Sequence, residues 1–262
     1  MKKLGQHFLK NTGVVKRMVA AIGPRAGEAI IEIGPGHGAL TVPLAAACAE
    51  AGARLAVIEK DERLAEKLRE LSSGHSIEII TGDALEIIGE MMDRPRKDGM
   101  KIVGNIPYYI TGKLLRTIGD AARAPERCVF MVQREVAERI MALPPKMNRL
   151  AASVQYWADG KIIARVPRED FSPPPTVDSA VIELASRHRG TKNPSETSRY
   201  YLAIRTIFAQ PRKTLLNNLG AARKASGKAL LPEKIKELGL DPGIRPQNLS
   251  REDIARVAEA LF

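Results

Sequence analysis

The pattern of apolar and polar residues changes along this 262-residue chain. In the first two-thirds, short apolar runs rich in β-branched residues alternate with segments whose apolar positions recur at helical spacing. The runs predict strands and the segments predict helices; the strands are residues 29–33, 55–58, 77–80, 102–103 and 129–132, and the helices are residues 40–50, 62–71 and 110–118. Strands that alternate with helices indicate an α/β fold with a parallel sheet covered on both faces.

The pattern becomes less regular after Arg149. Residues 154–157 and 161–166, which flank Ala-Asp-Gly, predict a β-hairpin, and residues 177–184 predict one further strand. Three prolines follow Phe171 and Ser172, so helix and central strand are excluded there. The last part is predicted to be helical, over residues 196–208, 213–219, 232–238 and 251–261. We therefore expect two domains, an α/β domain over residues 1–186 and a small all-helical domain over residues 187–262.

Charge is unevenly distributed between these two parts. The net charge is +11, and residues 187–262 hold 15 Lys and Arg against 7 Asp and Glu. A basic module on a nearly neutral body favours binding to nucleic acid through phosphates, although many basic proteins are merely soluble.

Two further features bear on the compartment. No apolar run approaches the ~20 residues that span a bilayer, and the first residues lack a secretory signal. Cys48 and Cys128 lie in apolar segments, as buried thiols of a reducing compartment do. We expect a cytoplasmic protein that binds no membrane; a mitochondrial presequence is the alternative, because no acidic residue precedes Glu28 and basic residues recur there. Nothing in the sequence suggests a metal site, because His75 and His188 have no cluster of ligands around them.

A glycine-rich loop, Gly34-Pro35-Gly36-His37-Gly38-Ala39, joins the first strand to a helix. Glycines let the backbone turn sharply and let a ligand approach closely, and the helix start offers free N–H groups. Gly34, Gly36 and Ala39 also satisfy the dinucleotide fingerprint, so a nicotinamide oxidoreductase is an alternative.

Acidic residues follow the next two strands. Glu59 ends the second strand and suits paired hydrogen bonds to ribose hydroxyls; Asp83, followed by Ala84, could accept a hydrogen bond from an adenine amino group. Taken singly, each is more simply an exposed acid or a helix N-cap. Together with Gly34 at successive strand ends, they predict a crevice for an adenosyl cofactor.

The fourth strand leads into Gly104-Asn105-Ile106-Pro107-Tyr108. An Asn105 side-chain oxygen and the Ile106 carbonyl could accept the two N–H bonds of an amine on an aromatic ring. Pro107 would fix the backbone that presents the carbonyl, and Tyr108 would offer a stacking face. The motif predicts methyl transfer to an aromatic amine, with catalysis mostly by positioning. A tight turn after a buried strand is the weaker alternative.

Several strings resemble the KsgA-type ribosomal RNA adenine dimethyltransferases. They are Gly-Gln-His-Phe-Leu at 5–9, Glu-Ile-Gly-Pro-Gly at 32–36, Val-Ile-Glu at 57–59, Gly-Asp-Ala at 82–84, Gly-Asn-Ile-Pro-Tyr at 104–108, Phe-Met-Val-Gln-Arg-Glu-Val-Ala at 130–137, Phe-Ser-Pro-Pro-Pro-Thr-Val-Asp-Ser-Ala-Val at 171–181, Arg-Lys-Thr at 212–214 and Arg-Pro-Gln-Asn-Leu-Ser at 245–250. The resemblance implies a Rossmann-like class I methyltransferase domain and a small helical C-terminal domain. It also implies transfer of methyl groups from S-adenosylmethionine to two adjacent adenines near the 3′ end of small-subunit rRNA, two to each, within a pre-assembled small ribosomal subunit. We expect a monomer.

The resemblance also implies the site residues. The cofactor site would comprise His7, Leu9, Gly34, Gly36, Glu59, Asp83, Ala84 and Asn105. The methyl-transfer site would comprise Asn105, Ile106, Pro107, Tyr108 and Phe171, with Phe171 stacked on a flipped adenine opposite Tyr108. On composition alone, His7 is a surface histidine, Leu9 a helix-start hydrophobe and Phe171 a core residue.

Two rival functions share the first domain. A large-subunit rRNA methyltransferase of the antibiotic-resistance type is less favoured, because residues 171–181 and the C-terminal strings fit the small-subunit enzyme. An RNA-binding assembly factor with dispensable activity would not require an intact Asn105 motif. The sequence departs from the family pattern in a short segment before Gly5 and in Pro211, where a second arginine commonly precedes Arg212. Both departures bear on RNA affinity and not on the chemistry.

Overall fold

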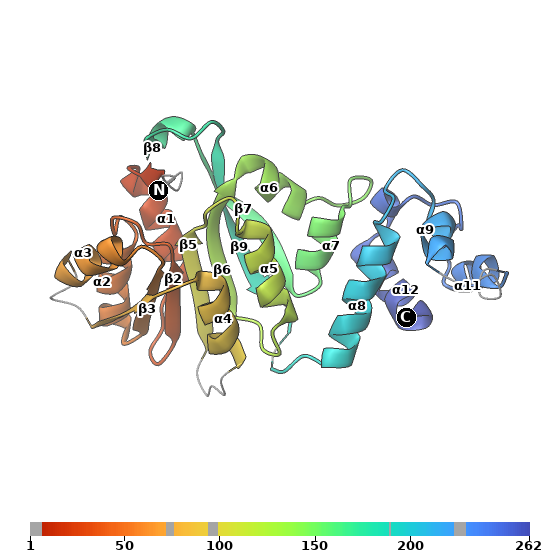
Figure 1. Cartoon of the computed structure of the whole chain (residues 1–262), viewed down its shortest axis with the longest axis horizontal. Helices are drawn as coiled ribbons and strands as arrows, with labels where there is room; N and C mark the ends of the chain where they lie inside the picture. The colour runs from red at the N-terminus through yellow and green to blue at the C-terminus, as the bar shows by residue number, and fades with distance from the viewer. Residues whose placement is uncertain (1–6, 72–75, 94–98, 189, 223–228) are drawn as a thin grey trace. The chain divides into compact units, whose positions relative to one another are not determined.

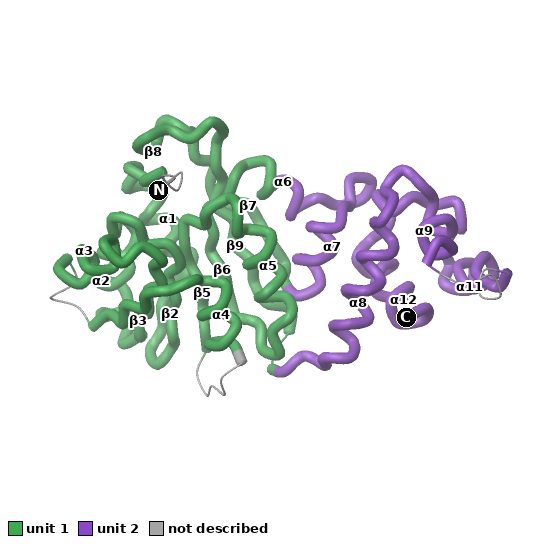
Figure 2. The backbone as a smooth tube through the Cα atoms, in the orientation of Figure 1, with its two compact units in different colours: residues 1–137, 158–190 green, residues 138–157, 191–262 purple. Residues whose placement is uncertain are grey.

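The computed structural model describes residues 7–71, 76–93, 99–188, 190–222 and 229–262. The chain forms two compact units, coloured separately in Figure 2. Residues 1–137 and 158–190 make up the first unit, and residues 138–157 and 191–262 make up the second. The second unit therefore takes in a segment, 138–157, that the sequence assigns to the first domain.

A seven-stranded sheet forms the centre of the first unit, in the order β4-β3-β2-β5-β6-β9-β7 (Figure 1). The five predicted parallel strands are confirmed, and their bounds are β2 (Ala29–Ile33), β3 (Arg54–Glu59), β4 (Ile77–Thr81), β5 (Met100–Asn105) and β6 (Arg127–Gln133). The predicted later strand is β9 (Ser179–Ser186), which is antiparallel to β6. Strand order reverses between β2 and β5, so ligands are expected at the carboxyl ends of these strands.

Helices cover both faces of this sheet. On one face lie α1 (Thr12–Ile22), α2 (Thr41–Ala51) and α3 (Glu62–Leu71), whose apolar residues share one core cluster with alternate residues of the strands. On the other face α4 (Ala84–Asp93) contacts α5 (Thr111–Asp120) (Figure 1). Strands covered on both faces are mostly apolar, which is why the sequence pattern predicts them; Glu32 in β2 and Lys101 in β5 are buried exceptions.

The predicted hairpin over residues 154–166 is wrong. Residues 149–155 form α7 (Arg149–Gln155), which begins where the Asn148 side chain accepts hydrogen bonds from the N–H groups of Leu150 and Ala151. A short apolar run cannot distinguish strand from helix, and here the N-cap at Asn148 settles the choice. β7 (Ala158–Val166) pairs with β9 instead, antiparallel, and forms the edge of the sheet.

The second unit is helical. The predicted helices are confirmed with small shifts as α8 (Pro194–Ile207), α9 (Leu215–Ala221), α11 (Leu231–Glu237) and α12 (Arg251–Leu261). They share an apolar core with α7, in which the Tyr200 hydroxyl donates to the Ala152 carbonyl at 3.1 Å. A short helix, α6 (Arg134–Ile140), spans the division between the units. The remaining elements are two short strands, β1 (Phe8–Leu9) and β8 (Phe171–Ser172), and two 3₁₀ turns, η1 (Arg168–Asp170) and η2 (Pro246–Asn248).

Within the described ranges, no helix is long and apolar enough to cross a membrane.

Candidate functional site

A cavity of about 480 Å³ opens at the carboxyl ends of β2, β3, β4 and β5. Every residue that the sequence assigns to the cofactor or methyl-transfer site lines it: His7, Leu9, Gly34, Gly36, Glu59, Asp83, Ala84, Asn105, Ile106, Pro107, Tyr108 and Phe171. The volume lies within the range of small-molecule sites. Gly5 and Gln6, the start of the first family string, lie outside the described residues.

The glycine loop forms one wall of the cavity. Gly34 and Gly36 have φ values of +66° and +57°, a left-handed conformation that side-chain-bearing residues rarely adopt. The Gly34 N–H donates to the Ile58 carbonyl at 3.0 Å, which ties the loop to β3. A Cβ at Gly36 would lie 3.0 Å from the Phe8 ring, so the loop and the N-terminal segment approach closely only because this residue is glycine.

Glu59 is buried at the end of β3, and its two carboxylate oxygens have different surroundings. Oε1 accepts hydrogen bonds from the N–H groups of Lys60 and Asp61 at 2.8 and 2.9 Å. Oε2 faces the Gly36 N–H at a long 3.4 Å. One oxygen therefore fixes the strand end, while the other keeps acceptor capacity toward the cavity.

Asp83 combines the two roles that the sequence left open. Its Oδ1 accepts a hydrogen bond from the Leu85 N–H at 2.9 Å at the start of α4, and its Oδ2 accepts one from Lys60 Nζ at 2.9 Å. The Lys60 ammonium, followed by the Leu85 N–H, holds the pKa of Asp83 below its usual value. A carboxylate that caps a helix and stays ionised thus also lines the cavity, beside Ala84.

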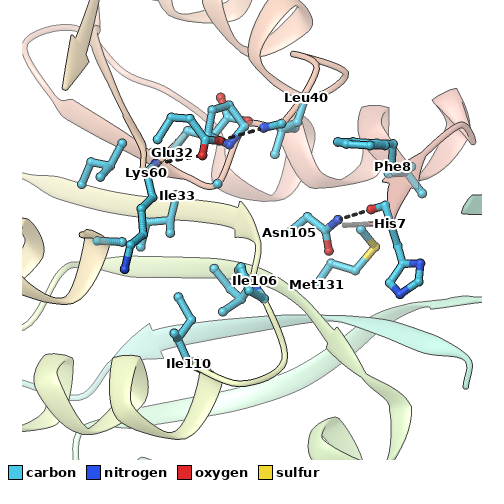
Figure 3. Close-up of a pocket in the computed structure, with 18 of the residues that line it drawn as sticks. His7, Phe8, Glu32, Ile33, Leu40, Lys60, Asn105, Ile106, Ile110 and Met131 are labelled. Carbon is cyan, nitrogen blue, oxygen red and sulfur yellow. Dashed lines mark hydrogen bonds between the residues drawn. The ribbon is translucent and has the colours of Figure 1, made fainter. Parts of the chain in front are cut away.

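Asn105 ends β5 with its side-chain orientation fixed. Its Nδ2 donates to the His7 carbonyl at 3.2 Å, which leaves Oδ1 as the acceptor end of the amide (Figure 3). The next residue, Ile106, is buried, and its N–H donates to the Met131 carbonyl at 3.0 Å. A Cβ at Gly104 would lie 2.4 Å from the Ile33 carbonyl oxygen, so glycine is needed where β2 and β5 converge on the site.

Two aromatic residues that the resemblance assigns to the methyl-transfer site, Tyr108 and Phe171, line the cavity with Asn105. The Tyr108 hydroxyl shares a hydrogen bond with Ser179 Oγ at 3.1 Å. The ring that faces Tyr108 in near-parallel fashion is His7, with ring centroids 6.5 Å apart. Phe171 is only 1% exposed and belongs to the core cluster of the sheet, as its composition suggested. Its stacking on a base stays a prediction.

The N-terminal segment is fixed over the cavity by distant residues. Leu9 pairs with Phe171 between β1 and β8, and a ring nitrogen of His7 lies 2.8 Å from the Pro173 carbonyl. Asn11 caps α1 and also donates to Asp170 through Nδ2 at 2.8 Å. These contacts bring His7 and Leu9 into the cavity wall, a placement that no local sequence pattern indicates.

Sequence reasoning missed Glu32, which lies within β2 and lines the cavity. Burial raises the pKa of this carboxyl to about 8. Among the described residues, its Oε2 has no hydrogen-bond partner. An acid inside the apolar run Ala-Ile-Ile-Glu-Ile is the signal that could have identified it, because buried polar groups are normally paired.

The described residues contain no group of three or more His, Cys, Asp and Glu side chains placed to hold a metal ion. His75, considered as a metal ligand above, lies outside them. Cys48 and Cys128 are buried free thiols.

Relatives match the chain over its whole length. A family model described as ribosomal RNA adenine dimethylase matches residues 1–261. The ribosomal RNA small subunit methyltransferase A of Pelotomaculum thermopropionicum is 37% identical over 272 residues, covering 100% of this chain and 91% of the relative. That of Chromobacterium violaceum is 36% identical over 263 residues, covering 99% and 95%.

Solved structures agree in fold. The 23S rRNA methyltransferase ErmE is 25% identical with a TM-score of 0.74, covering 97% of this chain and 99% of that one. A dimethyladenosine transferase from Plasmodium falciparum, 24% identical, gives a TM-score of 0.77 over 96% of each chain. The predicted Rossmann-like methyltransferase fold is thereby confirmed, and with a family match over residues 1–261 the chain belongs to the ribosomal RNA adenine dimethylases.

Proposed function

We propose that this chain transfers methyl groups from S-adenosylmethionine to the exocyclic amines of two adjacent adenines near the 3′ end of small-subunit rRNA, and dimethylates each. The observation that carries the proposal is the meeting of the Asn105 motif with the glycine loop and Glu59 in one cavity. A nicotinamide oxidoreductase has no use for that motif, and the family match removes that alternative.

The cavity fits S-adenosylmethionine by its donor and acceptor chemistry. Glu59 Oε2 suits the ribose hydroxyls, and Asp83 suits the adenine amino group. The unpartnered Oε2 of Glu32 offers a further buried acceptor to a ligand that carries hydrogen-bond donors. When bound, the cofactor supplies a methyl group on a sulfonium, which is reactive enough that no strong base is required.

The chain's own residues then position the amine. In the first transfer, Asn105 Oδ1 and the Ile106 carbonyl would each accept one N–H of the adenine amine, which turns its lone pair out of the ring plane toward the methyl group. In the second transfer, the one remaining N–H would donate to one of these two acceptors. After each transfer the methylated nitrogen releases one proton to solvent. Pro107 restricts the backbone next to that carbonyl. The Tyr108 ring, anchored through its hydroxyl to Ser179, gives the flipped base a fixed stacking face. Catalysis rests mainly on this alignment.

Small-subunit rRNA, within a pre-assembled small ribosomal subunit, is the favoured substrate. The curated relatives at 36–37% identity carry the small-subunit name, whereas the large-subunit enzyme ErmE is 25% identical. The net charge of +11 suits a polyanionic partner. We place the reaction in the cytoplasm, where buried free thiols such as Cys48 and Cys128 are typical, and propose that the protein acts as a monomer.

Incubation with methyl-labelled cofactor and purified ribosomal subunits tests the proposal. Small subunits that lack these methyl groups should take up label at two adjacent adenines, and large subunits should take up none. Mapping of the labelled bases checks both statements. Label confined to large-subunit RNA would select the rival enzyme and contradict the proposal.

A further inference from the structure

Tyr109 stands out beside the methyl-transfer motif. Its neighbour Tyr108 is anchored to Ser179, whereas Tyr109 is 67% exposed and still lines the cavity. A large aromatic side chain that is exposed to solvent at the opening of a site is typical of a binding surface.

Positive charges flank this ring. The Lys60 side chain is 62% exposed and forms an ion pair with Asp83 at 2.9 Å. Lys60 and Tyr109 both line the cavity, so the ammonium group and the ring lie at the same site. Lys113, at the start of α5, also acts on the Asp83 charge. Lys113 is exposed and follows Tyr109 by four residues. Exposed rings accompanied by lysines are the combination by which proteins bind single-stranded nucleic acid, with bases on the ring and phosphates near the cations.

The position of Tyr109 next to Tyr108 in the chain indicates which base of the RNA it would contact. Consecutive Cα atoms lie about 3.8 Å apart, so Tyr109 is next to the residue proposed to stack on the flipped adenine. Flipping one base out of its stack uncovers a face of the base beside it. In a reaction on two adjacent adenines, each turnover leaves one of them outside the cavity.

We propose that Tyr109 is the stacking platform for the nucleotide adjacent to the adenine in the cavity, with Lys60 and Lys113 facing its phosphates. This inference rests on the proposed function and adds a positioning residue for its substrate. Tyr109 holds the neighbouring base while the first is methylated, and so keeps both adenines at the site between turnovers.

Three substitutions test the platform: Tyr109→Ala, Tyr109→Leu and Tyr109→Phe. Leu71→Ala is the matched control, because Leu71 is 58% exposed and does not line the cavity. For each protein we would measure kcat and KM on undermethylated small subunits, the Kd for S-adenosylmethionine and the Tm. Since the side chain is exposed, all variants should keep the wild-type Tm.

Tyr109→Ala and Tyr109→Leu should raise KM for the subunits roughly tenfold, within the range expected for the loss of one base–ring stack. Tyr109→Phe should restore KM to within about twofold, and the cofactor Kd should stay unchanged throughout. The inference is overturned by an unchanged KM in Tyr109→Ala, by an equal loss in Tyr109→Phe, which would point to the hydroxyl, or by weaker cofactor binding, which would assign the ring to the cofactor. Wild-type enzyme inactive on small subunits would instead contradict the proposed function itself.

Discussion

The two ends of the Asn105 side-chain amide have different roles. The Nδ2 end holds the His7 carbonyl and so fixes the Oδ1 end as an acceptor. We predict that Asn105→Ala lowers kcat by about 100-fold or more, because misalignment of the amine removes the positioning on which transfer depends. Cofactor affinity, measured by titration, should weaken much less. Near-normal turnover would contradict the mechanism.

Glu32 makes stability depend on pH. Its pKa of about 8 lies above the ordinary value of 4.5, so the folded protein holds a proton that the unfolded chain releases. The contribution of Glu32 to the free energy of unfolding is therefore fully present below about pH 4.5 and is lost as pH rises to about 8, by at most about 1.4 kcal/mol per pH unit. Glu32→Gln removes this titration.

Urea unfolding at pH 5.5, 7 and 8.5 checks the Glu32 prediction. The stability of the Gln variant relative to wild type should increase with pH, while Glu62→Gln, at an exposed acid of α3, supplies the baseline. A difference that stays constant across the three pH values would show that Glu32 does not titrate in this range.

At the scale of elements, the pairing of β2 with β5 depends on Gly104. Because a Cβ there would meet the Ile33 carbonyl at 2.4 Å, Gly104→Ala should cost about 1–3 kcal/mol as the two strands move apart. The control is Gly112→Ala in α5, where nothing lies within 4 Å of the new Cβ and about 0.4–1 kcal/mol of stabilisation is expected. The denaturation midpoints of the Gly104→Ala and Gly112→Ala variants, each measured against wild type, check this prediction. Equal effects would refute a special role for Gly104.

Elements with a strong local pattern could be predicted from the sequence, and those that depend on distant partners could not. The five parallel strands are mostly apolar because both faces are covered, whereas β1 and β8 are two residues long and pair only with each other, with Leu9 opposite Phe171. The site divides in the same way. The site roles of Glu59 and Asn105 could be predicted because both residues end predicted strands. The site roles of His7 and Phe171 were predicted from the family resemblance alone. The exposure of the Tyr109 side chain could not be predicted from the sequence.

At the scale of the whole molecule, the excess positive charge predicts salt-dependent binding to ribosomal subunits. Truncation near residue 187 is a poor test, because α7 packs in the core of the second unit. We predict instead that Arg212→Ala combined with Lys213→Ala, both exposed, lowers the slope of log affinity against log salt by about one for each phosphate that the protein no longer neutralises.

Filter binding over a range of salt concentrations measures that slope. Lys67→Ala is the control, because Lys67 is an exposed lysine of α3 that does not line the cavity. It should leave the slope close to wild type. A double variant with the same slope as this control would remove these two residues from the RNA-binding surface.

The assignment of residues 138–157 to the second unit has a consequence for synthesis on the ribosome. The chain leaves the first unit before β9 has been made, yet β9 lies between β6 and β7 in the finished sheet. At roughly 5–20 residues per second, α7 then waits roughly 3–10 s before α8 has emerged to cover it. The first unit is complete only once residue 190 has been made, and by then residues 138–157 of the second unit have already been translated. The apolar face of α7 therefore stays uncovered on the nascent chain after the first unit is complete, until α8 joins it in the core of the second unit.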